Sequence, residues 1–188
     1  MLKKLILRRL AAVERDLGYD VSYLRDLLDA DLKAFMRFAK VMGISDYRRD
    51  LPVDASFAAK LVGTMVEDCG PCTQLMVTMA ERAQVSPDTL RAVLRSDDAA
   101  LNDDVRLSVR YARAVLARDA RADALRDQVL ARWGKRGLVS LAFALVSARV
   151  YPTLKYALGH GRTCSRVVVA GAALSVHVDN PTALGALA

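Results

Sequence analysis

The sequence predicts an all-α fold, a single-domain bundle of several helices. Apolar residues recur at spacings of three and four along most of the chain, which is the period of an amphipathic helix. The alternating pattern of a half-buried strand is missing from the sequence. With 188 residues, 53% of them hydrophobic, the chain can bury one full core without a second domain.

Two helices are predicted in an N-terminal portion, residues 1–50. An apolar stripe indicates a first helix that ends near Gly18, with Leu2, Leu5, Ile6, Leu10 and Val13 on one face. A second stripe, from Leu24 to Ala39, predicts a helix closed by Gly43. We expect residues 45–52 to form a connecting loop.

The core is predicted in residues 52–165. Small apolar residues from Ala55 to Val66 favour a helix packed on most sides, which breaks at Cys69-Gly70-Pro71. The following helix carries Cys72 and Met76 and ends before Ser86, which is the expected N-cap of the next one. Further helices are predicted at 90–94, at 105–116 after an Asn102 cap, and from Leu138, beyond a turn at 133–137, to residues 159–161.

Residues 166–188 are predicted to form a C-terminal tail. The β-branched run from Val167 to Leu174 is compatible with a strand, but an isolated strand has no partner to pair with. We therefore expect helix or irregular structure there.

Composition favours a cytoplasmic protein that binds neither nucleic acid nor membrane. The net charge is +7, but basic and acidic residues are interleaved, as on solvated helix faces, and no recognition motif accompanies them. The first apolar run is too short for a secretory signal. Between Leu138 and Leu158, Arg149, Pro152 and Lys155 favour a core helix over a membrane span.

The residues best suited to chemistry are Cys69 and Cys72, in the tetrapeptide Cys-Gly-Pro-Cys. Cysteines three apart in a helix's first turn can close a disulfide with little backbone movement. The helix N-terminus favours an anion and lowers the pKa of a thiol there, although Glu67 and Asp68 oppose this unless one accepts a proton. We expect redox activity without a cofactor.

Two other interpretations of the cysteines remain open. They could be small buried hydrophobic residues at a tight turn. They could also hold zinc together with His160 and Cys164, although Gly159 and Gly161 argue against a regular helix that presents His160. Redox activity is the preferred interpretation, and no bound metal is expected.

One stretch, Thr64–Val93, has the sequence TMVEDCGPCTQLMVTMAERAQVSPDTLRAV. It resembles the alkylhydroperoxidase-like and carboxymuconolactone decarboxylase-like superfamily, and the segment after Trp133 resembles that family's closing helical half. The resemblance implies an all-helical fold and a homo-oligomer. In its peroxidase members a C-x-x-C dithiol reduces peroxides and is recharged by a reducing partner protein, which here assigns that role to Cys69 and Cys72.

The resemblance also exposes two departures. Met76 stands where the peroxidase members have a histidine, and Ser56, Phe57 and Ala58 occupy the neighbourhood of their glutamate. Thiol chemistry needs a base and an acid, so Glu67 or Asp68 would have to substitute. Family precedent makes Cys72 the attacking thiol, whereas exposure before the helix favours Cys69.

The sequence therefore predicts a thiol-dependent peroxidase or disulfide oxidoreductase, with Cys69, Cys72 and Glu67 as candidate catalytic residues. Its substrate would be a small hydroperoxide or a protein disulfide. The alternatives are a non-redox, decarboxylase-like enzyme and a non-catalytic binding or assembly module of the same fold. Thioredoxin, which shares the tetrapeptide, is excluded because its motif follows a β-strand in an α/β sheet.

Overall fold

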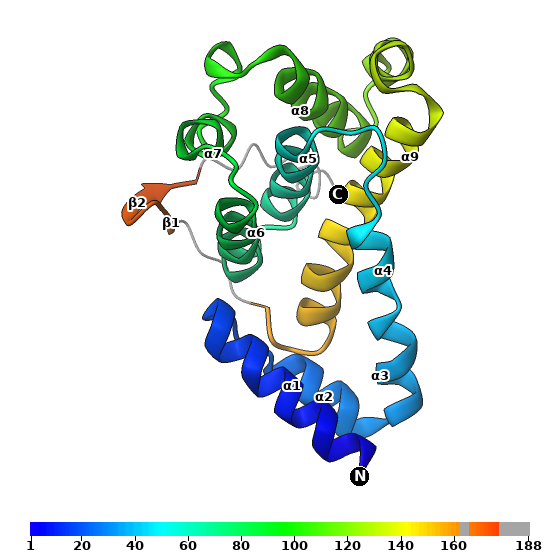
Figure 1. Cartoon of the computed structure of the whole chain (residues 1–188), viewed down its shortest axis with the longest axis vertical. Helices are drawn as coiled ribbons and strands as arrows, with labels where there is room; N and C mark the ends of the chain where they lie inside the picture. Colours follow the sequence, from blue (N-terminus) through cyan, green and yellow to red (C-terminus); the bar gives the residue numbers. More distant parts are fainter. Residues whose placement is uncertain (162–165, 177–188) are drawn as a thin grey trace, which may run out of the picture.

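A computed structural model describes residues 1–161 and 166–176, and most of these residues are helical (Figure 1). The prediction of a helical fold is thereby confirmed. The elements are α1 Leu2–Leu17, α2 Ser22–Ala30, α3 Leu32–Ala39, α4 Val41–Asp46, α5 Val53–Val66, α6 Gly70–Arg82, α7 Pro87–Leu94, a 3₁₀ turn Asp98–Ala100, α8 Asp103–Leu116, α9 Arg121–Ala157, and strands β1 Arg166–Val169 and β2 Ala172–Ser175.

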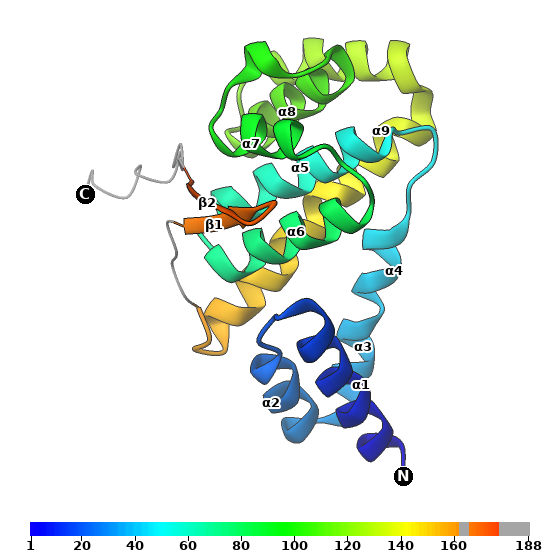
Figure 2. The same cartoon turned by 60° about the vertical axis from the view of Figure 1, so that its left-hand side comes forward.

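Helix α5 lies at the centre of the molecule, with α6, α7, α8 and α9 around it (Figures 1 and 2). Ten of its fourteen residues are buried, from Ala55 to Met65. Its buried residues include both apolar and polar side chains, and their number matches the prediction of a helix packed on most sides. The Ser108 hydroxyl of α8 donates to the Ala55 carbonyl at 2.6 Å and ties the two helices together.

Helices α5 and α9 approach closely at Gly63. A Cβ atom added to Gly63 would lie 2.9 Å from the Cβ of Ala148, and 3.6 Å from the Leu145 carbonyl oxygen. Real Cβ atoms do not come so close, so a side chain at this position would force the helices apart. The glycine therefore sets the spacing between α5 and α9.

Helix α9 consists of two halves separated at Gly134, where φ is 64° and ψ is −172°. The predicted turn at 133–137 is a kink at Gly134 alone, the apolar helix after it is confirmed, and the polar stretch before it is also helical. By length and composition α9 is the described helix that could cross a membrane. Core helices of globular proteins share those properties, and one side of α9, including Leu141, Ala144 and Leu145, is buried against the core.

The predicted second N-terminal helix, from Leu24 to Ala39, is two helices, α2 and α3, so that prediction was wrong. A further helix, α4, follows and extends into the predicted 45–52 loop. The break between α2 and α3 comes at Asp31, whose backbone is extended. The Asp31 side chain caps α3 by accepting a hydrogen bond from the Lys33 amide at 2.8 Å. Gly43 does not close a helix but lies inside α4. Aspartate favours this cap because its short side chain competes with the helix for backbone amides.

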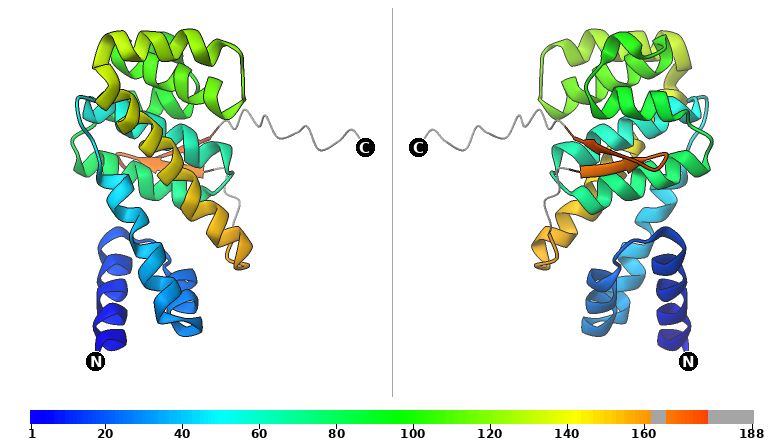
Figure 3. Two further views of the ribbon diagram at one scale, coloured as in Figure 1. Left: turned by 90° about the vertical axis from the view of Figure 1, so that its right-hand side faces the viewer. Right: turned by 90° about the vertical axis from the view of Figure 1, so that its left-hand side faces the viewer.

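The N-terminal helices have a small core of their own, beneath the central helices (Figure 3). Its buried residues are Ile6, Leu10, Tyr19, Val21, Tyr23, Leu28 and Phe35. Leu75 of α6, together with Tyr151 and Leu154 of α9, packs against this cluster. Tyr19 and its neighbours are thereby pressed against the start of α6.

Residues 166–175 form a β-hairpin, so the expectation of helix or irregular structure was wrong. The strands pair from Arg166 with Ser175 to Val169 with Ala172 around a two-residue turn, Ala170-Gly171, in which both residues have positive φ. Strand β1 therefore does have a pairing partner, which is strand β2 of the same hairpin. Gln74 of α6 completes the edge by exchanging hydrogen bonds with the backbone of Val168.

Substitution of Gly63 by valine should lower the free energy of unfolding by about 1–3 kcal/mol, the usual cost of overpacking a rigid contact. The same substitution at Gly43, where no atom lies within reach of an added Cβ, should change it by less than about 0.5 kcal/mol. Urea unfolding followed by circular dichroism measures both. Equal effects at the two sites would show that the spacing of α5 and α9 is not set at Gly63.

Candidate functional site

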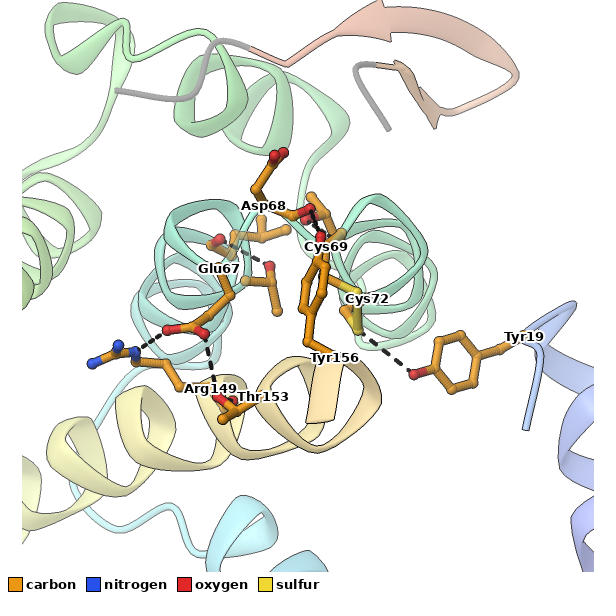
Figure 4. The surroundings of a disulfide bond; sticks show 11 residues. Tyr19, Glu67, Asp68, Cys69, Cys72, Arg149, Thr153 and Tyr156 are labelled. Atoms are coloured by element: carbon orange, nitrogen blue, oxygen red, sulfur yellow. Dashed lines mark hydrogen bonds and ion pairs between the residues drawn. A yellow bond between two sulfur atoms is a disulfide. The ribbon is translucent and has the colours of Figure 1, made fainter. Parts of the chain in front are cut away.

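The two cysteines meet at the turn between α5 and α6 (Figure 4). Cys69 is the N-cap of α6 and Cys72 lies in its first turn, as predicted. Their Cα atoms are 5.3 Å apart and their sulfurs form a disulfide. Only 1% of Cys69 and 3% of Cys72 is exposed, so the oxidised pair is enclosed by protein.

The local sequence explains this turn. Asp68 has a left-handed backbone with φ of 49°, which reverses the chain after α5. Pro71 lies in the first turn of α6, where its missing N–H costs no hydrogen bond. The Thr73 amide and hydroxyl both donate to the Cys69 carbonyl, at 2.9 and 3.1 Å, and fix the first cysteine relative to the helix.

A tyrosine from the N-terminal helices contacts the dithiol. The Tyr19 hydroxyl lies 3.6 Å from the Cys72 sulfur, and Figure 4 shows it approaching from the N-terminal helices, on the side opposite Glu67. Burial raises the pKa of Tyr19 to about 12, so the hydroxyl keeps its proton at neutral pH. It can therefore donate a hydrogen bond to Cys72 whenever the sulfur carries negative charge.

A buried lysine supports this tyrosine. Lys155 of α9 is 1% exposed, and its Nζ lies 4.7 Å from the ring centroid of Tyr19 and 5.3 Å from that of Tyr23. The two rings pack edge to face, with centroids 6.4 Å apart. Cation–π contact in a desolvated place is favourable by about 2 kcal/mol. Lys155 therefore holds both rings in place beside the dithiol turn.

Glu67, the third candidate from the sequence, faces α9. Its carboxylate forms an ion pair with Arg149 and accepts from the Thr153 hydroxyl at 3.2 Å (Figure 4). Next to it, the Asp68 carbonyl accepts from the Tyr156 hydroxyl at 3.0 Å. These contacts fasten the dithiol turn to α9. The role of Glu67 as a proton acceptor stays a prediction.

Cys72 also lines a cavity of about 250 Å³ between the N-terminal helices and α5, α6 and α9. Met76, which stands at the family's histidine position, forms part of its wall together with Met79. Most of the lining is apolar. The polar groups are few, and they include the Tyr19 hydroxyl and the amine of Lys60.

Among residues 1–161 and 166–176 no group of three His, Cys, Asp or Glu side chains is placed to hold a metal ion. Cys164 of the hypothetical zinc site lies outside these residues. His160 is engaged elsewhere, since its Nδ1 lies 3.2 Å from the Ser22 hydroxyl and its Nε2 lies 2.7 Å from the Asp26 carboxylate. It joins the end of α9 to α2.

Comparison with family models, with curated proteins and with solved structures finds no match to this chain. The resemblance seen in Thr64–Val93 therefore stays an expectation. The function is therefore inferred from the geometry around Cys69 and Cys72.

Replacing Tyr19 by phenylalanine should make the Cys72 thiolate harder to form. In reduced protein with Cys69 changed to serine, we expect the pH midpoint of Cys72 alkylation to rise by about 1 unit, because a hydrogen bond to a charged sulfur contributes about 1.5–3 kcal/mol. Tyr156→Phe is the matched control, since that hydroxyl bonds to the Asp68 carbonyl instead. Identical midpoints in both variants would rule out the contact as a source of thiolate stability.

Proposed function

We propose that this chain is a dithiol oxidoreductase that reduces a small hydroperoxide, as the resemblance to alkylhydroperoxidase-like proteins implies. The observation that carries the proposal is the Cys69–Cys72 disulfide at the first turn of α6, with Cys72 lining a cavity and in contact with the Tyr19 hydroxyl. A pair that closes within one helical turn can open and close without refolding the chain.

The proposed reaction has two steps. The Cys72 thiolate attacks the outer oxygen of the hydroperoxide, the O–O bond breaks, and the alcohol leaves after taking up a proton. Cys69 then attacks the sulfenic acid on Cys72, which releases water and forms the disulfide. Two thiols are oxidised, one peroxide is reduced, and a dithiol partner must return two electrons for the next cycle.

The order of attack follows from access. Cys72 lines the cavity and contacts Tyr19, so a substrate in the cavity reaches its sulfur. The Tyr19 hydroxyl is protonated at neutral pH and lies 3.6 Å from the Cys72 sulfur, so it can donate a hydrogen bond to the departing oxygen. We therefore assign attack to Cys72 and resolution to Cys69.

Both sulfurs are buried and Cys72 lines a cavity of about 250 Å³, a volume that suits a small hydroperoxide as substrate. A reducing partner protein, a reducing compartment such as the cytoplasm, and self-association belong to the same proposal as expectations. Neither nucleic acid nor membrane is required by it.

A second candidate is a non-catalytic member of the same fold. Two observations favour it: Met76 replaces the histidine that the resemblance would require, and both cysteines are buried. It predicts thiols that react slowly with peroxide. The decarboxylase-like alternative predicts activity that survives the loss of both cysteines.

Measuring hydroperoxide consumption should distinguish the redox enzyme from the non-catalytic and the decarboxylase-like alternatives. With dithiothreitol as reductant, we expect Cys72→Ser to reduce turnover to background, and Cys69→Ser to leave a sulfenic acid on Cys72 that dimedone traps and mass spectrometry detects. Cys164→Ser is the matched control and should keep its turnover. Background rates in the unmodified protein would overturn the redox proposal.

Glu67 is proposed as a positioning residue that acts through its bonds to α9. Glu67→Gln retains an acceptor for Thr153, so we expect turnover to fall by less than about tenfold and its pH midpoint to stay unchanged. A loss of about 10²–10⁴-fold with an altered pH profile would instead establish Glu67 as the acid–base group.

A further inference from the structure

The cavity beside Cys72 contains a buried cation that the redox proposal does not use. Lys60 of α5 lines the cavity and is only 8% exposed. Its Nζ donates to the Ser45 carbonyl at 2.8 Å and lies 5.2 Å from the Phe57 ring centroid. In the described part of the chain these contacts hold the amine without an ion pair. A desolvated ammonium without a counter-ion is costly, so an anion in the cavity would relieve that cost.

The charges around Lys60 leave a positive balance. Asp46 lines the same cavity and acts on the amine from a distance, but its own side chain faces solvent. Arg48 on the following loop opposes Asp46. Burial outweighs the aspartate and lowers the pKa of Lys60. Burial thus disfavours the charged amine, and an anion that enters the cavity beside Lys60 would stabilise the ammonium form.

The remaining walls are suited to a hydrocarbon chain. They combine Leu10, Val13 and Leu17 of α1 with Leu75, Met76 and Met79 of α6. Methionine and leucine side chains adapt to an irregular apolar ligand at little cost. Lys60 lies six residues before the end of α5, a rise of about 9 Å, so the cation is separated from the dithiol turn along the cavity wall.

We propose that this cavity binds an amphipathic anion, a medium-chain carboxylate whose head group pairs with the Lys60 ammonium and whose hydrocarbon chain lies along α1 and α6 toward Cys72. Charge recognition at one place and apolar contact along the rest is the usual composition of a small-molecule site. The binding involves no thiol chemistry. It goes beyond the proposed redox function and can hold or fail independently of it.

Titration calorimetry tests the proposal on the full chain in its oxidised form, without peroxide or reductant, so that redox activity plays no part. The probes are octanoate and octanol, which share a chain and differ in the head group. We expect octanoate to bind at least tenfold more tightly. Lys60→Met should remove that preference while octanol binding persists, and Lys60→Arg should retain it.

Lys135→Met, on the exposed side of α9, is the matched control for loss of one positive charge and should bind octanoate as the unmodified protein does. Asp46→Asn removes the opposing charge and should tighten octanoate binding. Val13→Trp, at a cavity residue that is 41% exposed, should weaken the binding of both probes.

Equal affinities for the two probes, or an unchanged preference in Lys60→Met, would refute anion recognition. Failure of both probes to bind would refute the site itself.

Discussion

The contact between α5 and α9 at Gly63 and Ala148 controls the positions of the other parts of the candidate site. Because no side chain separates the two helices, the C-terminal end of α5 reaches α9, and Glu67 can pair with Arg149. The same approach places the dithiol turn beside Tyr156 and brings Lys155 of α9 under the rings of Tyr19 and Tyr23. Close packing of small residues thus provides the precision that the proposed reaction of the two cysteines requires.

The N-terminal helices contribute to the site rather than merely flanking it. The segment between α1 and α2 brings Tyr19 to Cys72, and α1 forms one wall of the cavity. Their attachment is distributed over apolar contacts with α6 and α9, the ion pair between Asp16 and Arg82, and the bonds from His160 to α2.

Sequence reasoning succeeded where structure depends on neighbouring residues. The start of α6 at Pro71, the Ser86 cap that accepts from the Thr89 amide, and the Asn102 cap that accepts from the Val105 amide are all local interactions. The break at Asp31 was also local, but a continuous apolar stripe concealed it. The hairpin could not be predicted in the same way, because Val167, Val169 and Leu174 are buried against helices that lie far earlier in the chain.

The candidate site likewise contains residues that the local sequence predicts and residues that only the packing of the helices reveals. Cys69 and Cys72 are recognisable from four residues, whereas Tyr19, Lys60 and Lys155 are brought to the cavity or the dithiol by packing of distant helices, and no pattern around them indicates it.

Helix α6 is held at several places along its length, and this restricts how the molecule can respond to a change at its first turn. Gln74 and Glu81 bind the hairpin backbone, and Arg82 binds Asp16. A helix anchored in this way resists rotation and sliding, so opening or closing the sulfur–sulfur bond is absorbed by side-chain torsions near Cys72. The rigid helix therefore limits structural change to the atoms around the two sulfurs.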